Sequence, residues 1–264
     1  NRLAAVPVLA TADMKKLIAL LLPLLVAGCI PYIGNPTATP IALNSIDKPA
    51  PPRAGDRYTY VVRNGYNSEQ VLRLDYRVDQ VNAGNYAVAI SPEPSPGMSA
   101  RTATFSNDGN WIRHVLYNHD QPVDYEFSPA YLAYAFPLAA GQTWSERVNA
   151  RDPATGKVRS VRVDGKVLGA ERVRLAAGEF DTVKIYRLIW AGDWDGFLTE
   201  TVITETEWYS PKLGRAVRLD RNSQWYDRSR GADNTFGTTN QLIRGNWHVI
   251  ELAASSGAAG GPSR

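Results

Sequence analysis

The chain has 264 residues, of which 44% are apolar, with 29 Lys and Arg against 26 Asp and Glu and a single Cys. This hydrophobic content is enough for the core of one large domain or two small ones and argues against a disordered chain. The charge is nearly balanced, so a nucleic acid is not an expected partner. One Cys excludes an intramolecular disulfide framework and a cysteine-based zinc site.

The N-terminal region has the pattern of a secretory signal. Lys15 and Lys16 follow a plausible initiator, Met14, and precede an apolar run that ends in small residues. The run from Leu17 to Gly28 has 12 residues. As a helix it would be about 18 Å long, which is too short for a hydrocarbon core of roughly 30 Å. We therefore expect residues 1–28 to be upstream sequence and a cleaved signal peptide rather than a permanent span.

Val26-Ala27-Gly28-Cys29 resembles the bacterial lipobox, and the only Cys of the chain stands at the position that this motif requires. The resemblance implies cleavage between Gly28 and Cys29 and attachment of lipid, including palmitate-type acyl chains, to Cys29. Several acyl chains give stable membrane anchoring where one does not. Ile30 stands where an Asp would retain the protein in the inner membrane, so the resemblance implies the outer membrane. The alternative is an ordinary signal peptide that contains a Cys.

Composition divides the rest of the chain into three parts. Residues 29–55 are rich in Pro with little apolar periodicity, which predicts a lipidated Cys followed by a tether. Residues 56–252 are expected to form the folded body, as one unit or as two subdomains near 56–127 and 138–252. Residues 253–264 are small and polar, which predicts a disordered tail.

The dominant pattern in the body is alternation of apolar and polar residues between turn dipeptides, which is typical of β-strands and hairpins. The strands expected from it, in chain order, are 57–63, 70–81, 86–90, 102–105, 111–116, 157–163, 166–175, 182–190, 197–209, 216–224 and 241–252. Only Pro129–Leu138 is compatible with a short helix. The prediction is an all-β fold, antiparallel, with a barrel-like, half-barrel or sandwich body and at most one short helix.

Three short sequence segments of the body are similar to segments of an uncharacterised class of exported bacterial β-proteins. They are Phe136-Pro-Leu-Ala-Ala-Gly-Gln-Thr-Trp144, Ala177-Gly-Glu-Phe-Asp-Thr-Val-Lys-Ile185 and Glu207-Trp-Tyr-Ser-Pro-Lys-Leu-Gly-Arg-Ala-Val-Arg218. The resemblance implies an antiparallel β body and transfers no catalytic residues. Their glycines, prolines and large aromatics have the character of fold determinants.

Two polar groups are candidates for chemistry. His114, His119 and His248 would ligate a metal if they converged, but they are expected at a strand, a turn and a distant strand, so no metal site or other cofactor is predicted. Asp193 and Asp195 stand two residues apart and could act as an acid–base pair or half of a calcium site. Flanking glycines favour an exposed hairpin turn instead, in which each Asp→Asn change would cost little.

Aromatic residues crowd the last third of the chain. A groove that binds a glycan or an acyl ligand would use the residues Trp190, Trp194, Trp208, Trp225 and Tyr226. Packing is favoured over recognition, and Trp208 in particular is expected to close a strand end over the barrel interior. The basic segment Arg221–Arg230 is expected to be a solvated loop.

These observations predict an outer-membrane lipoprotein, anchored by lipid and facing the periplasm. Its β body is expected to act as a non-catalytic binding or envelope-assembly module, with an envelope protein, a glycan or a lipid as partner. Two alternatives stay open. One is an enzyme that acts on a glycan or lipid through Asp193 and Asp195, and the other is a structural subunit of an envelope complex.

Overall fold

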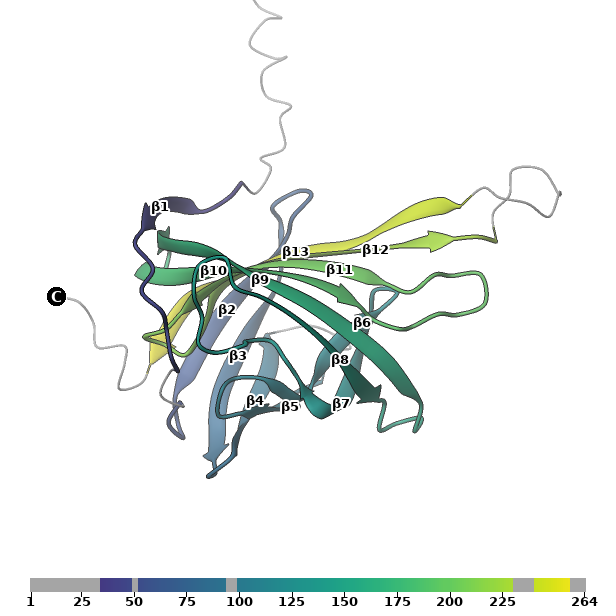
Figure 1. The fold of residues 1–264 in the computed structure, drawn as a ribbon, viewed down its shortest axis with the longest axis horizontal. Helices are drawn as coiled ribbons and strands as arrows, with labels where there is room; N and C mark the ends of the chain where they lie inside the picture. The colour runs from purple at the N-terminus through teal and green to yellow at the C-terminus, as the bar shows by residue number, and fades with distance from the viewer. Residues whose placement is uncertain (1–33, 49–51, 94–98, 230–239, 257–264) are drawn as a thin grey trace, which may run out of the picture. The chain divides into compact units, whose positions relative to one another are not determined.

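The computed structural model describes residues 34–48, 52–93, 99–229 and 240–256. Within these ranges the chain forms one 13-stranded sheet and no helix (Figure 1). This confirms the all-β, antiparallel prediction. No helix in the described part of the chain is long and apolar enough to cross a membrane.

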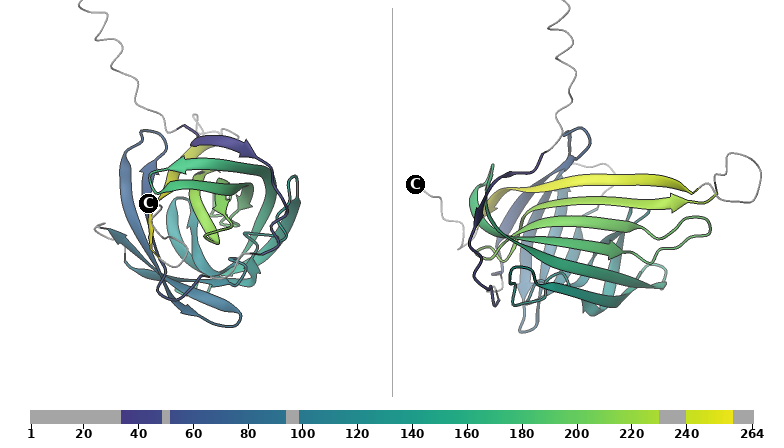
Figure 2. Two further views of the ribbon diagram at one scale, coloured as in Figure 1. Left: turned by 90° about the vertical axis from the view of Figure 1, so that its left-hand side faces the viewer. Right: turned by 45° about the horizontal axis from the view of Figure 1, so that its top comes forward.

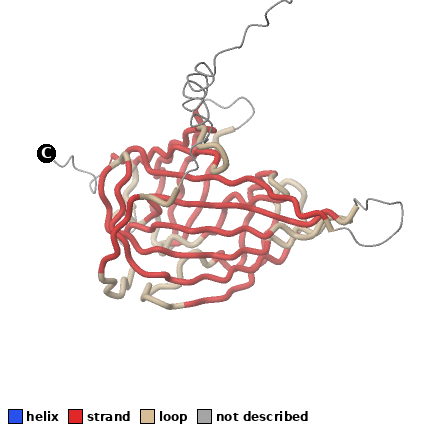
Figure 3. Tube along the Cα trace, turned by 90° about the horizontal axis from the view of Figure 1, so that it is seen from above, coloured by secondary structure: helices blue, strands red, loops and turns tan. Residues whose placement is uncertain are grey.

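The strands follow one another in the chain with connections that are mostly short (Figure 3). They are β1 (Thr37–Ile41), β2 (Arg57–Asn64), β3 (Gln70–Val81), β4 (Asn85–Glu93), β5 (Arg101–Ser106), β6 (Trp111–Asn118), β7 (Gln121–Tyr131), β8 (Thr143–Arg151), β9 (Val158–Leu175), β10 (Gly178–Trp190), β11 (Val202–Ser210), β12 (Arg215–Asp227) and β13 (Gln241–Ser256).

The sheet closes on itself. From β2 to β13 each strand pairs antiparallel with its neighbours in the chain, and β13 pairs with β2, which completes the ring (Figure 2). A single closed sheet leaves no boundary between the two subdomains that the sequence allowed. Closure also removes the unpaired edges that an open sheet would expose.

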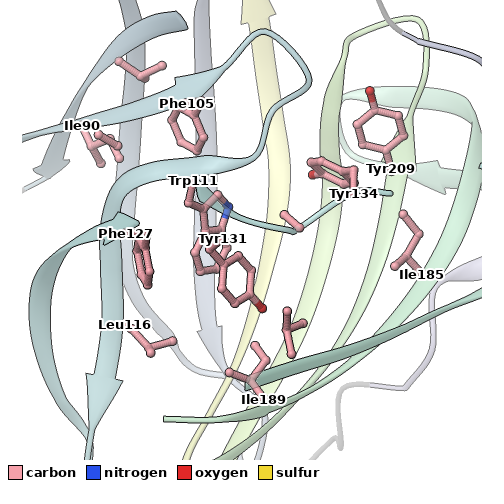
Figure 4. Close-up of a cluster of buried hydrophobic side chains, with 14 of the residues drawn as sticks. Ile90, Phe105, Trp111, Leu116, Phe127, Tyr131, Tyr134, Ile185, Ile189 and Tyr209 are labelled. Atoms are coloured by element: carbon pink, nitrogen blue, oxygen red, sulfur yellow. The ribbon is translucent and has the colours of Figure 1, made fainter. Parts of the chain in front are cut away.

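Alternation of side chains along the strands produces an apolar interior. In β10, Val183, Ile185 and Ile189 are fully buried on one face, while their neighbours on the other face are more exposed. Aromatic rings fill much of the interior near β6 and β7, where Trp111 stacks on Tyr131 with ring centroids 4.2 Å apart (Figure 4).

Most turns follow the dipeptides that predicted them. Asp164-Gly165, which separated the expected strands 157–163 and 166–175, is an exception, because it lies inside β9 and pairs with Leu188 and Arg187 of β10. Gly109 in the turn between β5 and β6 has a φ of 80°, a conformation that glycine adopts without steric cost. Between β6 and β7, His119 and Asp120 both have positive φ, at 43° and 66°. Two successive residues of this kind are the mark of a type I′ hairpin turn, whose twist matches that of the flanking strands.

The segment Pro129–Leu138, the one candidate for a helix, is not helical. β7 continues to Tyr131, and the chain then forms a loop whose Ala133 and Leu138 are buried in the core. Tyr134 of this loop packs against Tyr209 of β11, with ring centroids 4.8 Å apart (Figure 4). Burial of these apolar side chains outweighs the weak helical pattern of the segment.

The predicted boundaries of the body are too narrow at both ends. Within the expected tether, β1 pairs with Ala170–Arg174 of β9, and Ile46 exchanges backbone hydrogen bonds of 3.0 and 2.9 Å with Leu138. Prolines are tolerated on such an edge strand because its outer N–H groups need no ladder partner. At the C-terminus, β13 runs to Ser256 and so includes the start of the expected tail. Residues 1–28, Cys29 and the rest of the tail, 257–264, lie outside the described residues.

Candidate functional site: the barrel interior

Three adjacent strands place charged side chains inside the barrel at the same level. Arg187 of β10 is the register partner of Glu205 of β11, which in turn faces Arg221 of β12. Paired residues of neighbouring strands share a face, so the three side chains form a row. Arg187 Nε donates to Glu205 Oε2 at 2.9 Å, and Arg221 Nε donates to Glu205 Oε1 at 2.6 Å.

A second carboxylate completes this paired network. Arg187 Nη2 donates to Glu207 Oε2, and Arg187 Nη1 donates to the carbonyl of Ala133 at 3.3 Å. The hydroxyl of Tyr134 donates to Glu207 Oε1 at 2.6 Å. The network thus links β10, β11 and β12 to the loop that follows β7, and its two arginines are balanced by two glutamates.

Electrostatics keep the network charged. Burial alone would raise the pKa of Glu205, but the neighbouring guanidinium groups of Arg221 and Arg187 lower it to about 2. Burial opposes the charge of Arg187, yet Glu207 and Glu205 outweigh it and hold the pKa of Arg187 well above its ordinary value. Glu205 and Arg187 are therefore ionised across the physiological pH range.

A cavity of about 140 Å³ lies beside the paired network inside the barrel. Its aromatic lining residues are Tyr60, Tyr76, Tyr86, Phe105, Trp111, Tyr117 and Tyr134, and aliphatic side chains such as Leu74 and Val88 complete the walls. Concave sites with apolar walls and a few convergent polar groups are the usual form of a small-molecule site.

Two further arginines, Arg101 at the start of β5 and Arg215 at the start of β12, line this cavity. The Nε atom of each is buried and lacks a hydrogen-bond partner. Among the described residues neither arginine forms an ion pair with a carboxylate. Arg215 instead lies over tyrosine rings, with its guanidinium carbon 3.9 Å from the centroid of Tyr58 and 5.1 Å from that of Tyr76. The cavity therefore carries two positive charges that the paired network does not balance.

His114 adds a neutral polar group to the same cavity. Its ring stacks on Trp111 with centroids 4.5 Å apart. Burial lowers the pKa of His114 to about 3, and the positive charges of Arg101 and Arg221 act in the same direction. Nδ1 lies 3.1 Å from the carbonyl of Val115, which can only accept, so Nδ1 carries the proton and Nε2 is left as an acceptor.

The structure corrects the prediction for Asp193. Asp193 is only 1% exposed, and its carboxylate accepts hydrogen bonds from Thr201 N and Oγ1, both at 2.6 Å, and from His119 N at 3.2 Å. It fastens the loop before β11 to the turn between β6 and β7. Asp195 is exposed, as expected for a turn residue, so the two carboxylates do not share a face.

The three histidines contact different partners. His114 lies in the cavity, His119 Nδ1 is 3.5 Å from Asp193 Oδ2, and the ring of His248 packs near Tyr117 with centroids 6.2 Å apart. In the described ranges no group of three or more His, Cys, Asp or Glu residues is arranged to hold a metal ion.

The five aromatic residues singled out from the sequence do not line the cavity. Trp194 and Tyr226 are exposed, Trp190 is half-buried and Trp225 is buried. Trp208 is 1% exposed, in agreement with a packing role, but it does not close the interior. Its register partners are Lys184 and Arg218, so it lies on the opposite face from the interior residue Glu207.

The segment Arg221–Arg230 is not a solvated loop over its first part, because residues 221–227 belong to β12. Arg221 faces the interior, and Arg230 lies outside the described residues.

One interior arginine, Arg187, did leave a signal in the sequence. Arg187 falls at the same parity as Val183, Ile185 and Ile189, so a strand with a buried face has a charge in the middle of that face.

Scans against protein-family models and curated proteins found no match. The chain is similar to three solved structures. One, provisionally described as a lipoprotein of Parabacteroides distasonis, is 13% identical with a TM-score of 0.46, and the match covers 81% of this chain and all of that one. Another, provisionally described as an exported protein of Bacteroides fragilis with a YmcC-like fold, is 14% identical with a TM-score of 0.45 over 80% of this chain and all of that one. The hypothetical lipoprotein YmcC of Escherichia coli is 10% identical, with a TM-score of 0.40 over 76% and 85% of the two chains.

Proposed function

We propose that the protein is an outer-membrane lipoprotein, anchored through Cys29, whose barrel binds an envelope ligand in its interior without catalysing a reaction. The lipobox-like sequence at Cys29 supports the anchor, and a periplasm-facing body is part of the same proposal. The cavity beside the paired network supports the binding role.

The observation that carries the binding role is the cavity itself. A small barrel either fills its interior with side chains or keeps room for one ligand. Here the aromatic rings of Trp111, Tyr86 and Phe105 border open space instead of closing it. Polar groups at Arg101, Arg215 and His114 face the same space, which gives a ligand both apolar surface and hydrogen-bonding partners.

The rival enzyme proposal receives less support from the described residues. Its two carboxylates, Asp193 and Asp195, would have to face a substrate from the same cleft. Asp193 is instead engaged by Thr201 and His119, and neither aspartate lines the interior cavity. The inward-facing Glu205 and Glu207 are each held in ion pairs with arginine.

The binding role is tested by filling the cavity. Val88 is 1% exposed and lines the cavity, so Val88→Trp places a ring in the space that a ligand would occupy. Leu168→Trp on the outer face of β9, where Leu168 is exposed, is the matched control. Envelope components captured by the full chain from detergent-solubilised membranes should be lost with Val88→Trp and kept with Leu168→Trp. Equal capture by both variants, with both folded by circular dichroism, would contradict an interior site.

The anchor is tested separately. Cys29→Ser removes the thiol that would carry the lipid, so the chain should remain an unprocessed precursor and leave the outer-membrane fraction. Mass spectrometry of the wild-type protein should show a lipid-modified Cys29 at the N-terminus. An unmodified Cys29 within a longer chain would overturn the anchor and, with it, the proposed location.

A further inference from the structure

We infer that the barrel interior binds an organic anion of about the size of one ring, a carboxylate or a phosphate, through the guanidinium groups of Arg101 and Arg215. This inference rests on the proposed binding role of the cavity and names the chemistry of its ligand.

The charge balance of the interior points to an anion. Arg187 and Arg221 are matched by Glu205 and Glu207 with direct hydrogen bonds. Arg101 and Arg215 face the same interior without a carboxylate partner among the described residues, and each has a buried Nε–H that donates to nothing. Both side chains are half-buried, and a buried N–H without an acceptor costs free energy in a folded protein. An anionic ligand would supply the missing negative charge and accept hydrogen bonds from the free Nε–H groups.

Arginine is also the side chain best suited to this task. Its planar guanidinium offers parallel donors that match the oxygens of a carboxylate or a phosphate. Arg215 lies over the rings of Tyr58, Tyr60 and Tyr76, with its guanidinium carbon 3.9 to 5.4 Å from their centroids. These contacts fix the plane of the group before a ligand arrives, which lowers the entropy lost on binding.

The size and the walls of the cavity point to a ring. Its volume of about 140 Å³ is close to the roughly 150 Å³ of an engineered protein cavity that admits benzene. Phe105, Trp111 and Tyr86 present flat faces or edges that suit an aromatic ring or the apolar face of a sugar. The acceptor Nε2 of His114 lies beside the same walls and suits a hydroxyl of the ring.

The experiment is a calorimetric titration of the full chain, in detergent, with three ring anions: benzoate, phenyl phosphate and glucuronate. Benzamide, phenol and glucose are the respective neutral counterparts, and inorganic phosphate tests for the anion without a ring. At least one ring anion should bind at least 10-fold more tightly than its neutral counterpart. Benzoate or phenyl phosphate as the best ligand would indicate an aromatic acid or ester, and glucuronate would indicate an acidic sugar of an envelope glycan.

Charge-removing variants assign the binding to the two arginines. Because a hydrogen bond to a charged group is stronger than a neutral one, Arg101→Gln and Arg215→Gln should each weaken the best ring anion by about 10- to 100-fold. Arg215→Lys should recover part of the loss because it restores the charge. Arg174→Gln removes an exposed arginine that is paired with Glu179 on the surface, and it should leave the dissociation constant unchanged.

The inference fails if no ring anion binds, if the neutral counterparts bind equally well, or if neither Gln variant changes the affinity while both fold normally. Tighter binding of inorganic phosphate than of any ring anion would also overturn it, because the ring would then contribute nothing. These failures leave the proposed binding role standing as long as Val88→Trp still abolishes capture of envelope components. Loss of the binding role itself would appear as capture that is insensitive to Val88→Trp.

Discussion

The barrel interior holds two pairs of arginines whose surroundings differ. Arg187 and Arg221 lie in a row with Glu205 across three strands, and every charge of that group has an opposite charge in contact. Arg101 and Arg215 line the adjoining cavity without such a partner. A single barrel therefore contains arginines that are paired with carboxylates and arginines that have no carboxylate partner among the described residues.

We propose that the difference separates residues that stabilise the fold from residues that bind the inferred ligand. Removing one member of a buried ion pair is strongly destabilising, because the other member is then left charged and unpaired. Arg101 and Arg215, which are half-buried and have no carboxylate partner among the described residues, already bear part of that cost in the wild-type protein. Their removal should thus affect binding far more than stability, and the following predictions test that contrast.

The largest effect is expected for Glu205→Gln. The glutamine is neutral, so Arg187 loses one of its two carboxylates and Arg221 loses its only one among the described contacts. The expected loss is about 3 to 5 kcal/mol in the free energy of unfolding, the range for breaking a buried pair. Denaturant unfolding followed by tryptophan fluorescence measures it.

Glu179→Gln is the control for that change. Glu179 also pairs with an arginine, Arg174, but both side chains are exposed on the surface. Surface pairs contribute about 0 to 1 kcal/mol, so this variant should unfold close to wild type. If the two Glu→Gln variants were equally stable, the paired network would not be a determinant of the fold.

Trp208→Ala is expected to cost about 3 to 5 kcal/mol, as large aromatic deletions from cores do. The ring is buried among Glu171, Lys184 and Arg218, and its Nε1 donates to Glu171 Oε2 at 2.8 Å. Arg218 also donates to the carbonyl of Gly34 at 3.0 Å, so the N-terminal segment lies close to this group. Thermal unfolding of Trp208→Ala measures the cost.

Trp194→Ala is the matched control for that deletion, since Trp194 is 59% exposed. It should lie within about 0.5 kcal/mol of wild type, as surface substitutions usually do. A Trp208→Ala protein with an unchanged melting temperature would contradict a packing role on the outer face.

Most of the fold could be predicted from the sequence, because alternation and turn dipeptides report local geometry directly. Every strand expected between Arg57 and Leu252 overlaps a strand of the structure, although the expected strands 157–163 and 166–175 are one strand, β9. The closure of the sheet through β13 and β2 was not predictable with certainty, since it joins segments that are distant in the chain. β1 was missed because its paired edge depends on β9 and not on its own Pro-containing sequence. β7 and β8 were not among the expected strands either.

The candidate site was harder to predict than the fold. Alternation assigns a residue to one of two faces, but a bulge such as that between Trp208 and Tyr209 shifts the assignment. The alternation pattern also cannot show which inward-facing charged side chains contact one another across strands. Asp193 was misjudged for a similar reason. Its partners, His119 and Thr201, come from a distant hairpin and from the far side of its own loop, and glycine content alone suggested an exposed turn.

Asp→Asn variants at positions 193 and 195 are expected to differ by an intermediate amount in the free energy of unfolding. Asp193→Asn should cost about 2 kcal/mol, because the amide turns a donor toward Thr201 or His119 and a hydrogen bond to a charged acceptor contributes about 1.5 to 3 kcal/mol. Asp195→Asn, at an exposed position, should stay within about 0.5 kcal/mol. Chemical denaturation of the two variants measures both. Equal stability would show that the buried carboxylate is not what fastens the loop.

A pH dependence follows from His114. The unfolded chain takes up a proton on this side chain as pH falls through about 6.5, whereas the folded protein keeps it neutral down to about pH 3. The unfolded state therefore binds more protons in this window, and stability falls as the pH is lowered. Between pH 7 and pH 5 the expected loss from His114 is about 1 to 2 kcal/mol.

His114→Phe keeps the stacking on Trp111 and cannot titrate, so it should reduce that slope. His248, whose pKa burial also lowers, should account for part of the slope that remains. Glu205 does not interfere, because its pKa is lowered from 4.5 to about 2 and its contribution is lost only below this window. Urea unfolding at pH 7 and pH 5 measures the slopes, and equal slopes for both proteins would contradict a buried neutral imidazole.

For the two pairs of arginines, the most informative variant is one that should lose no stability. Arg101→Met keeps a long apolar side chain at the cavity wall and removes a charge whose Nε–H has no acceptor. Because the wild-type protein already bears the cost of that unpaired group, the variant should be as stable as wild type or more stable, within about 1 kcal/mol. Thermal and urea unfolding without added ligand would measure it. A loss of 3 kcal/mol or more, comparable with that of Glu205→Gln, would show that Arg101 belongs to the structural network after all. A stable variant that no longer binds ring anions would place Arg101 among the residues kept for the ligand.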